Sequence, residues 1–228
     1  MTLRRMCLLF LGFVFSVGIC GAWFASQRNS VPVVKGFAEK KTLPVFVAGT
    51  DLLAEELVRY EGEYIEDTEF GEYVFVTGLI LRNTGNKGVL CVKVKLIGEC
   101  DTLDFEATYI PPGKSVLVLE KNRKETVDTQ FYSCVGQVEY SDDNWENREE
   151  VKIQYLGNDF IRITNTTGKA VTGIELYYKT EYANGLFYMG GITHCYRIRS
   201  LSPGESVAVS PEYYASDCSQ IVYVRTEG

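Results

Sequence analysis

The stretch NTTGKAVTGIELYY, residues 165–178, decides the fold. An Asn-Thr turn opens it, and the apolar residues Ile174, Leu176 and Tyr178 then follow at every second position. A period of two indicates a β-strand with one face buried and the other in water. A matching stretch with the same turn and the same alternation, NTGNKGVLCVKVKL, stands earlier in the chain at residues 83–96.

These two stretches belong to a longer internal repeat. The second copy has nine more residues between its long strand and the next Pro-Gly turn, and seven fewer between that turn and a cysteine. Both length changes fall between expected strands, so we interpret the repeat as a duplication. The aligned positions include Asn83 with Asn165, Lys87 with Lys169, Val89 with Val171, Pro112-Gly113 with Pro203-Gly204, and Cys134 with Cys218.

The repeat predicts an all-β protein with two tandem Ig-like antiparallel β-sandwich domains. Each copy of about 75 to 85 residues suits one small sandwich. The domains are expected at residues 51–141 and 151–228, with an acidic linker at residues 142–150. We expect Trp145, inside that linker, to hold the two domains together.

Two further elements are expected, a stalk before the first domain and a short helix at the start of that domain. Residues 26–50 are weakly patterned and resemble a stalk. Thr50 or Asp51 provides an N-cap for a short helix over Leu52–Val58, with acidic residues in its first turns.

The N-terminus carries an uncharged run of 19 residues, from Met6 to Phe24, after two arginines. At about 1.5 Å per residue this run covers most of a hydrocarbon core of ~30 Å. Because a positive flank stays in the cytoplasm, residues 1–25 predict a single-pass membrane anchor with the C-terminal domains outside. Two other interpretations stay open, namely a signal peptide cleaved after Ala22 and a lipoprotein signal acylated at Cys20.

Composition excludes several classes of function. Lys plus Arg number 23 and Asp plus Glu number 30, which gives a formal net charge of −7. This balance argues against nucleic acid as a partner, because nucleic acid recruits a basic surface. It also argues against attraction to an anionic lipid surface through charge.

The second copy resembles the FxLYD-type β-sandwich domains of secreted or membrane-anchored Gram-positive proteins, and the first copy matches more loosely. The whole arrangement is similar to membrane-anchored double-sandwich proteins of Gram-positive gut bacteria. The resemblance implies an extracytoplasmic adaptor or binding module and brings no catalytic residue with it. The matching motifs are Ile161-x-Ile163-x-Asn165-x-Thr167, Val171-x-x-Ile174-x-Leu176-Tyr177-Tyr178 and Leu201-Ser202-Pro203-Gly204-Glu205.

Five cysteines follow the N-terminal run. The repeat predicts one disulfide per domain, Cys100–Cys134 and Cys195–Cys218. In the chain-entropy model each bridge contributes about 3–4 kcal/mol to a small domain. Cys91 is left over on the wet face of its strand. It is a tolerated surface cysteine, a thiol for an intermolecular disulfide, or the partner of Cys134 in place of Cys100.

The sequence holds no strong signal for catalysis, for a cofactor or for a metal. His194, the only histidine, stands beside Cys195, but neighbouring strand residues point to opposite faces and cannot act as base and nucleophile. One histidine and no Cys-x-x-Cys leave no usual zinc set. The carboxylates at Glu61, Glu63 and Glu66 are interpreted as a solvated acidic loop, with weak calcium binding or a glycosidase pair as alternatives.

A candidate binding patch lies in the nine extra residues of the second copy, Tyr182 to Gly190. They contain an Asn-Gly hairpin signal flanked by Tyr182, Phe187 and Tyr188. Tyr213 and Tyr214 are expected to add to the same patch. Exposed aromatic rings give large contact area at low entropic cost. The alternative is that these rings cover the domain's own core or the joint between the domains.

These observations predict a non-enzymatic binding or scaffolding module, held at the cell membrane by one N-terminal helix, with its domains outside the cytoplasm. Its expected partner is a cell-envelope protein, a peptide or a glycan. The alternatives are a secreted, signal-cleaved binding protein and a glycan- or cell-wall-active enzyme that uses surface carboxylates.

Overall fold

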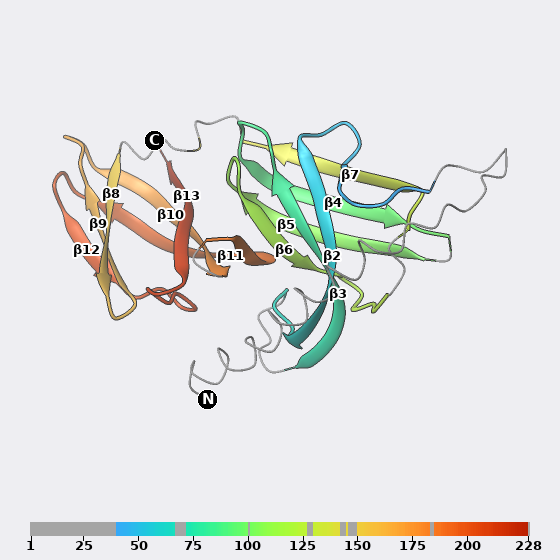
Figure 1. Ribbon diagram of the computed structural model, residues 1–228. Coiled ribbons are helices and arrows are strands. Elements are labelled where there is room, and N and C mark those ends of the chain that lie inside the picture. Colours follow the sequence, from blue (N-terminus) through green and yellow to red (C-terminus); the bar gives the residue numbers. More distant parts are fainter. Residues whose placement is uncertain are drawn as a thin grey trace. The chain divides into compact units, whose positions relative to one another are not determined.

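The computed structural model describes residues 40–66, 72–99, 101–126, 130–141, 145, 150–182 and 185–227 (Figure 1). Within these ranges the protein is all-β, with thirteen strands and no helix. It follows that none of these residues belongs to a helix that is long and apolar enough to cross a membrane. The predicted anchor at residues 1–25 and most of the predicted stalk lie outside the described residues.

The first copy of the repeat forms two facing sheets. Alternating side chains from both sheets meet in one core, as expected from the period-two pattern. In β4, for example, Val92, Val94 and Leu96 are buried while Lys93 and Lys95 are exposed. One sheet contains β1 (Val45–Phe46), β2 (Leu52–Glu63), β3 (Tyr73–Asn83) and β6 (Ser115–Leu119), and the other contains β5 (Thr102–Ile110), β4 (Val89–Ile97) and β7 (Ser133–Tyr140).

The second copy repeats this pairing. Strands β12, β9 and β8 follow the order of β6, β3 and β2, while β11, β10 and β13 follow the order of β5, β4 and β7. Their core includes Ile161, Ile174, Leu176 and Ile221. The strands are β8 (Val151–Gly157), β9 (Phe160–Asn165), β10 (Val171–Tyr182), β11 (Phe187–Leu201), β12 (Ser206–Val209) and β13 (Ser219–Glu227).

The aligned residues Asn83 and Asn165 form equivalent hydrogen bonds in the two copies. The amide of Asn83 donates to the carbonyls of Lys87 at 2.8 Å and Ile110 at 3.1 Å. The amide of Asn165 donates to the corresponding carbonyls of Lys169 at 2.8 Å and Leu201 at 2.9 Å. Both side chains are fully buried. Each asparagine therefore satisfies backbone acceptors at the point where two strands turn away from the sheet.

The helix expected over Leu52–Val58 is wrong, because these residues lie in strand β2. Leu52 and Ala54 are buried at alternate positions, and the strand pairs with β3 along its length. Pairing with a neighbouring strand overrides the local capping signal. The stalk is also shorter than predicted, since Val45 pairs with Ala54 and Lys41 bridges to Phe131.

The two copies share one continuous sheet, which the sequence did not predict. The nine extra residues of the second copy extend β10 and β11 beyond their own sandwich. At this extension Tyr188 and Met189 of β11 pair in parallel with Val116 and Leu117 of β6. The result is a seven-stranded sheet in the order β1-β2-β3-β6-β11-β10-β13. The insertion is therefore the element that joins the sandwiches.

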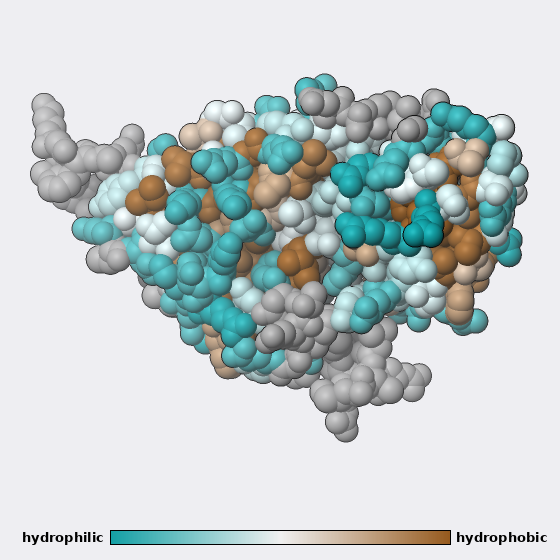
Figure 2. Space-filling model, turned by 180° about the vertical axis from the view of Figure 1, so that it is seen from behind, coloured by the Kyte–Doolittle hydropathy of each residue, from teal (hydrophilic) through white to brown (hydrophobic). Residues whose placement is uncertain are grey.

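Exposed apolar side chains are present but dispersed. On the face drawn in Figure 2, hydrophobic residues gather in several separate patches among hydrophilic ones. The large exposed side chains include Phe46, Leu186, the neighbours Tyr73 and Phe75 on β3, and Tyr155, Leu156 and Phe160 at the β8–β9 hairpin. Scattered exposed side chains of this kind are normal for folded domains and do not by themselves mark a binding site.

Candidate functional site

The joint between the sandwiches contains an aromatic cluster centred on Trp145. Its ring lies 4.7 Å from that of Tyr223 on β13 and 6.3 Å from that of Tyr109 on β5. Tyr109 in turn stacks on Tyr177 of β10 at 4.1 Å. Side chains of both sandwiches thus meet on one indole, which confirms the prediction that Trp145 holds the two domains together.

The backbone makes room for this indole at Gly88. A Cβ atom at Gly88 would lie 1.6 Å from Cε3 of Trp145, far inside van der Waals contact. Glycine is therefore required here by the close approach of the ring.

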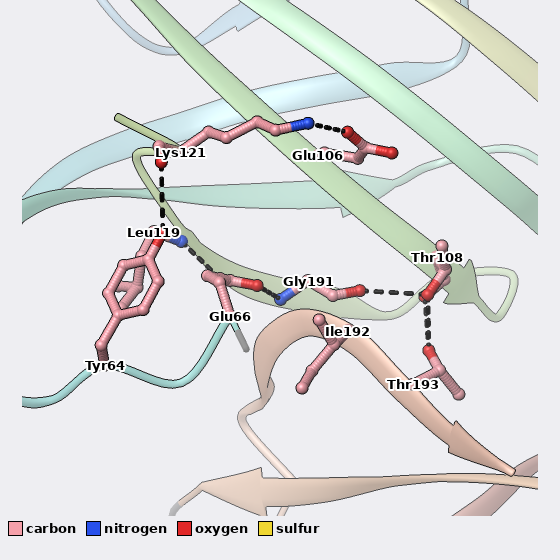
Figure 3. A pocket seen from close by; sticks show the side chains of 9 residues that line it. All are labelled: Tyr64, Glu66, Glu106, Thr108, Leu119, Lys121, Gly191, Ile192 and Thr193. Carbon is pink, nitrogen blue, oxygen red and sulfur yellow. Dashed lines mark hydrogen bonds and ion pairs between the residues drawn. The ribbon is translucent and has the colours of Figure 1, made fainter. Parts of the chain in front are cut away.

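Residues of both copies also line a cleft of about 420 Å³ at the joint, drawn in Figure 3. Both sandwiches contribute to its walls. Its lining residues are Tyr64, Glu66, Glu106, Thr108, Leu119 and Lys121 from the first copy and Gly191, Ile192 and Thr193 from the second. We refer to this hollow as the joint cleft.

Hydroxyl groups and an ion pair form opposite ends of the joint cleft (Figure 3). The hydroxyls of Thr108 and Thr193 lie 2.9 Å apart, and Thr193 also hydrogen-bonds to the Thr108 carbonyl at 3.0 Å. Lys121 donates to Glu106 at 2.8 Å. This hydrogen bond from Lys121 is the main cause that holds the pKa of Glu106 below its usual value.

Glu66 lies between Leu119 and Gly191 and is bound by the backbone of both sandwiches (Figure 3). Its two carboxylate oxygens accept the N–H groups of Leu119 and Gly191, each at 2.6 Å. Burial raises the pKa of this carboxyl from 4.5 to about 7, against the effect of those hydrogen bonds and of the Lys179 charge. The interpretation of Glu66 as part of a solvated acidic loop is therefore wrong.

Lys179 of β10 contacts the same segment of β11, at the irregularity in its pairing with β10. Its ammonium donates to the carbonyls of Gly190 at 3.1 Å, Gly191 at 3.0 Å and Ile192 at 2.6 Å. The side chain is 1% exposed, and burial lowers its pKa from 10.5 to about 7. Sequence reasoning missed this residue. Its one signal is a lysine that directly follows the aromatic residues Tyr177 and Tyr178 in an expected strand.

The predicted aromatic patch is not one surface. Tyr188 is buried in the core at the joint, and Tyr182 stacks on Phe187 at 5.0 Å. For Tyr188 the alternative prediction is confirmed, namely that the ring covers the joint between the domains. Phe187 and Tyr188 both belong to the extended end of β11. Tyr188 is the one that pairs with β6.

Tyr213 and Tyr214 belong to a different cluster, next to His194. Tyr214 is buried against Tyr178, whereas Tyr213 is 44% exposed with its ring 5.0 Å from His194. Of the five predicted patch residues, only Tyr213 is strongly exposed in this structure. The five side chains therefore do not present a common binding face.

The predicted disulfide Cys195–Cys218 is not formed. Cys195 of β11 is a free thiol that pairs across to Tyr177 of β10, and Tyr177 pairs with Tyr223 of β13. The two cysteines therefore lie two strands apart, at about 5 Å per strand. Along the strand direction, Cys218 is also five residues away from Tyr223. That separation exceeds the Cα–Cα limit of about 7 Å for a disulfide.

The remaining cysteines give a similar result. Cys134 is a buried free thiol, and burial raises its pKa to about 11. Its predicted partner Cys100 lies outside the described residues. The alternative pairing with Cys91 is excluded, because Cys91 is opposite Glu139 on β7 while Cys134 is opposite Leu96 of β4. Cys91 is a half-buried free thiol.

His194 and Cys195 lie on opposite faces of β11, as the sequence predicts. The His194 ring stacks on Tyr178 at 5.5 Å, in the core of the second copy. Cys195 instead lies near Glu175, Arg197 and Tyr177. These two side chains therefore do not form a base and a nucleophile. Within the described ranges, no three carboxylate, histidine or cysteine side chains are grouped so as to hold a metal ion.

No family model matches the chain, and no curated protein matches it.

Proposed function

We propose that the protein is a non-enzymatic binding or scaffolding module, anchored in the cell membrane by residues 1–25, with two tandem Ig-like, FxLYD-type sandwiches outside the cytoplasm. The sandwiches descend from one duplicated unit and act as a single rigid body. The ligand contacts the joint cleft. A secreted form that has lost its signal segment is the alternative for its attachment.

One observation carries this proposal. The joint cleft is built from both sandwiches, which are fixed to each other by the β6–β11 pairing, by Trp145 and by Glu66. Two domains joined in this way cannot move freely relative to each other, whereas two domains joined only by a flexible linker can. A rigid cleft lowers the entropic cost of binding, because the lining side chains are already ordered.

A glycan-active enzyme is the second candidate, since Glu66 and Glu106 line one cleft and their pKa values are shifted in opposite directions. Such a division is typical of acid and nucleophile pairs. The hydrogen bonds of Glu66 argue against it, because both oxygens already accept backbone N–H groups, which hold this carboxyl against the two sandwiches. Incubation with cell-wall glycan, with release of reducing ends as the readout, separates the candidates. Release that disappears with Glu106→Gln would favour the enzyme.

The binding proposal is tested by crosslinking the full chain in its own membranes and identifying the captured proteins by mass spectrometry. Lys121→Glu reverses a charge in the joint cleft, while Lys95→Glu makes the same change on the outer face, where Lys95 pairs with Asp104. We expect one envelope protein to be captured by the wild type and by Lys95→Glu, and lost with Lys121→Glu. Equal capture by both variants would contradict a role for the cleft.

A further inference from the structure

We propose that strand β8 binds an extended segment of a partner protein in which apolar and acidic residues alternate. The segment is added beside β8 as a further strand of the sheet β12-β9-β8. Strand β8 shares no residue with the joint cleft, so this surface is additional to the one in the proposed function.

Strand β8 presents unpaired backbone groups at the edge of its sheet. The Glu150 carbonyl accepts the Thr166 N–H, on the side of β9. Because the backbone groups of successive strand residues point to opposite sides, those of Val151, Ile153 and Tyr155 point away from β9. Within the described ranges these groups have no hydrogen-bond partner on that side. Such an edge is a template for a further strand.

In the first copy the equivalent edge is covered by a strand. Ala54 of β2 and Ile153 of β8 are equivalent, because each lies two residues after the partner of the aligned asparagine. Strand β1 pairs with Ala54 through Val45, and Val47 then donates its N–H to the Leu52 carbonyl at 2.9 Å. Ala54 is fully buried, whereas Ile153 is partly exposed. The duplicated fold thus accommodates a strand at a position that no described strand fills in the second copy.

The core side of this edge favours apolar residues in the added strand. In the first copy Val47 is fully buried in the core and Val45 packs against it. The side chains of Ile153 and Tyr155 lie on the same face of β8 as the buried Val151, and Tyr155 is 54% exposed. A strand beside β8 therefore meets apolar surface at every second position.

The outer side of the same edge is basic. Lys152 and Arg162 are exposed there, and within the described ranges neither forms an ion pair. No residue of β8, β9 or β12 is acidic, although the whole chain has a formal net charge of −7. Acidic side chains on the outward positions of the added strand are therefore attracted to this face. A second copy of β8 fits less well, because it brings another lysine instead.

The test measures binding of the fluorescein-labelled peptide Glu-Val-Glu-Val-Glu-Val-Glu to the full chain in uncharged detergent micelles, by fluorescence anisotropy. The peptide Lys-Val-Lys-Val-Lys-Val-Lys is the control. We expect the acidic peptide to bind about tenfold more tightly. Non-specific attraction to an acidic chain would favour the lysine peptide. Amide hydrogen exchange should slow in β8 when the acidic peptide is bound, and stay unchanged in β12 at the opposite edge.

Three variants separate the backbone contribution from the charge. Ile153→Pro removes an N–H that points away from β9, keeps the β8–β9 pairing and should raise the Kd about tenfold. Ala208→Pro is the matched control, because the Ala208 N–H points away from β9 on β12, and the Kd should not change. Lys152→Glu changes an exposed side chain, so it tests the proposal even where a proline variant fails to fold. It should raise the Kd about fivefold.

The proposal would be overturned by equal or tighter binding of the lysine peptide, by an unchanged Kd in Lys152→Glu, or by unchanged hydrogen exchange in β8. A wild-type chain that dimerises while Ile153→Pro is a monomer would assign the edge to a second copy and would also overturn it. None of these results bears on the joint cleft, which is tested separately by partner capture with Lys121→Glu.

Discussion

Glu66 and Lys179 bind opposite sides of one residue, Gly191, whose N–H donates to the Glu66 carboxylate at 2.6 Å and whose carbonyl accepts from the Lys179 ammonium at 3.0 Å. The two charges come from different sandwiches and contact the same residue of strand β11. Buried charges are costly unless hydrogen bonds and an opposite charge compensate them. This arrangement supplies both, and it does so where the two copies of the repeat meet.

Replacement of Lys179 should destabilise the protein strongly. Lys179→Met keeps the stem but leaves three carbonyls without their donor and Glu66 without its compensating charge. We expect a loss of about 3–5 kcal/mol in the free energy of unfolding, measured by urea denaturation. Lys152→Met on the exposed face of β8 is the matched control and should change little. A loss below about 1 kcal/mol for Lys179→Met would show that the ammonium is not needed.

The stability of the fold should depend on pH through Glu66. Its pKa is raised from 4.5 to about 7 by burial, so between these values the folded state binds more protons than the unfolded state. The free energy of unfolding therefore falls as pH rises from about 4.5 to about 7, by an amount on the order of 3 kcal/mol from this group. Glu66→Gln removes this contribution. Parallel pH profiles for the wild type and Glu66→Gln would contradict the assignment.

The close approach of Trp145 to Gly88 predicts a large effect of a single methyl group. Gly88→Ala should displace the indole, cost about 1–3 kcal/mol and shift the Trp145 fluorescence to longer wavelength. The measurement is made in a Trp23→Phe background, which leaves Trp145 as the single tryptophan. Gly168→Ala is the control, because nothing lies within 4 Å of its Cβ position. Unchanged emission in Gly88→Ala would mean that the indole is not seated on this glycine.

Two tyrosines from the predicted patch should behave differently. Tyr188 is 3% exposed in the core at the joint, so Tyr188→Ala should cost about 3–5 kcal/mol. Tyr213 is 44% exposed, and Tyr213→Ala should cost less than about 1 kcal/mol. Thermal melting of both variants provides the comparison. Similar melting temperatures for the two variants would place Tyr188 on the surface instead.

Local sequence patterns predicted much of each sandwich. The alternation at Val92, Val94 and Leu96 identified a strand with one buried face, and burial follows that alternation. The aligned asparagines Asn83 and Asn165 identified equivalent turns, and their hydrogen bonds are equivalent. These features depend on residues close in the sequence, where side-chain type and backbone preference act directly.

The candidate site was not predicted, because it depends on contacts between distant residues. Glu66 and Gly191 are far apart in the chain, and a carboxylate in an acidic segment gives no sign that the backbone of another domain will bury it. The segment Leu52–Val58 carried a local helix signal, and pairing with β3 made it a strand.

The sequence by itself therefore determined the all-β class, the repeat and the role of Trp145. Only the tertiary structure decided that the extra residues of β11 pair with β6, that Tyr188 is buried there, and that Lys179 and Glu66 both bind Gly191. The physical reason is that period and turn chemistry are fixed by neighbours in the chain. Whether a charge is buried, and which sheets pair, depends instead on contacts between residues that are distant in the chain.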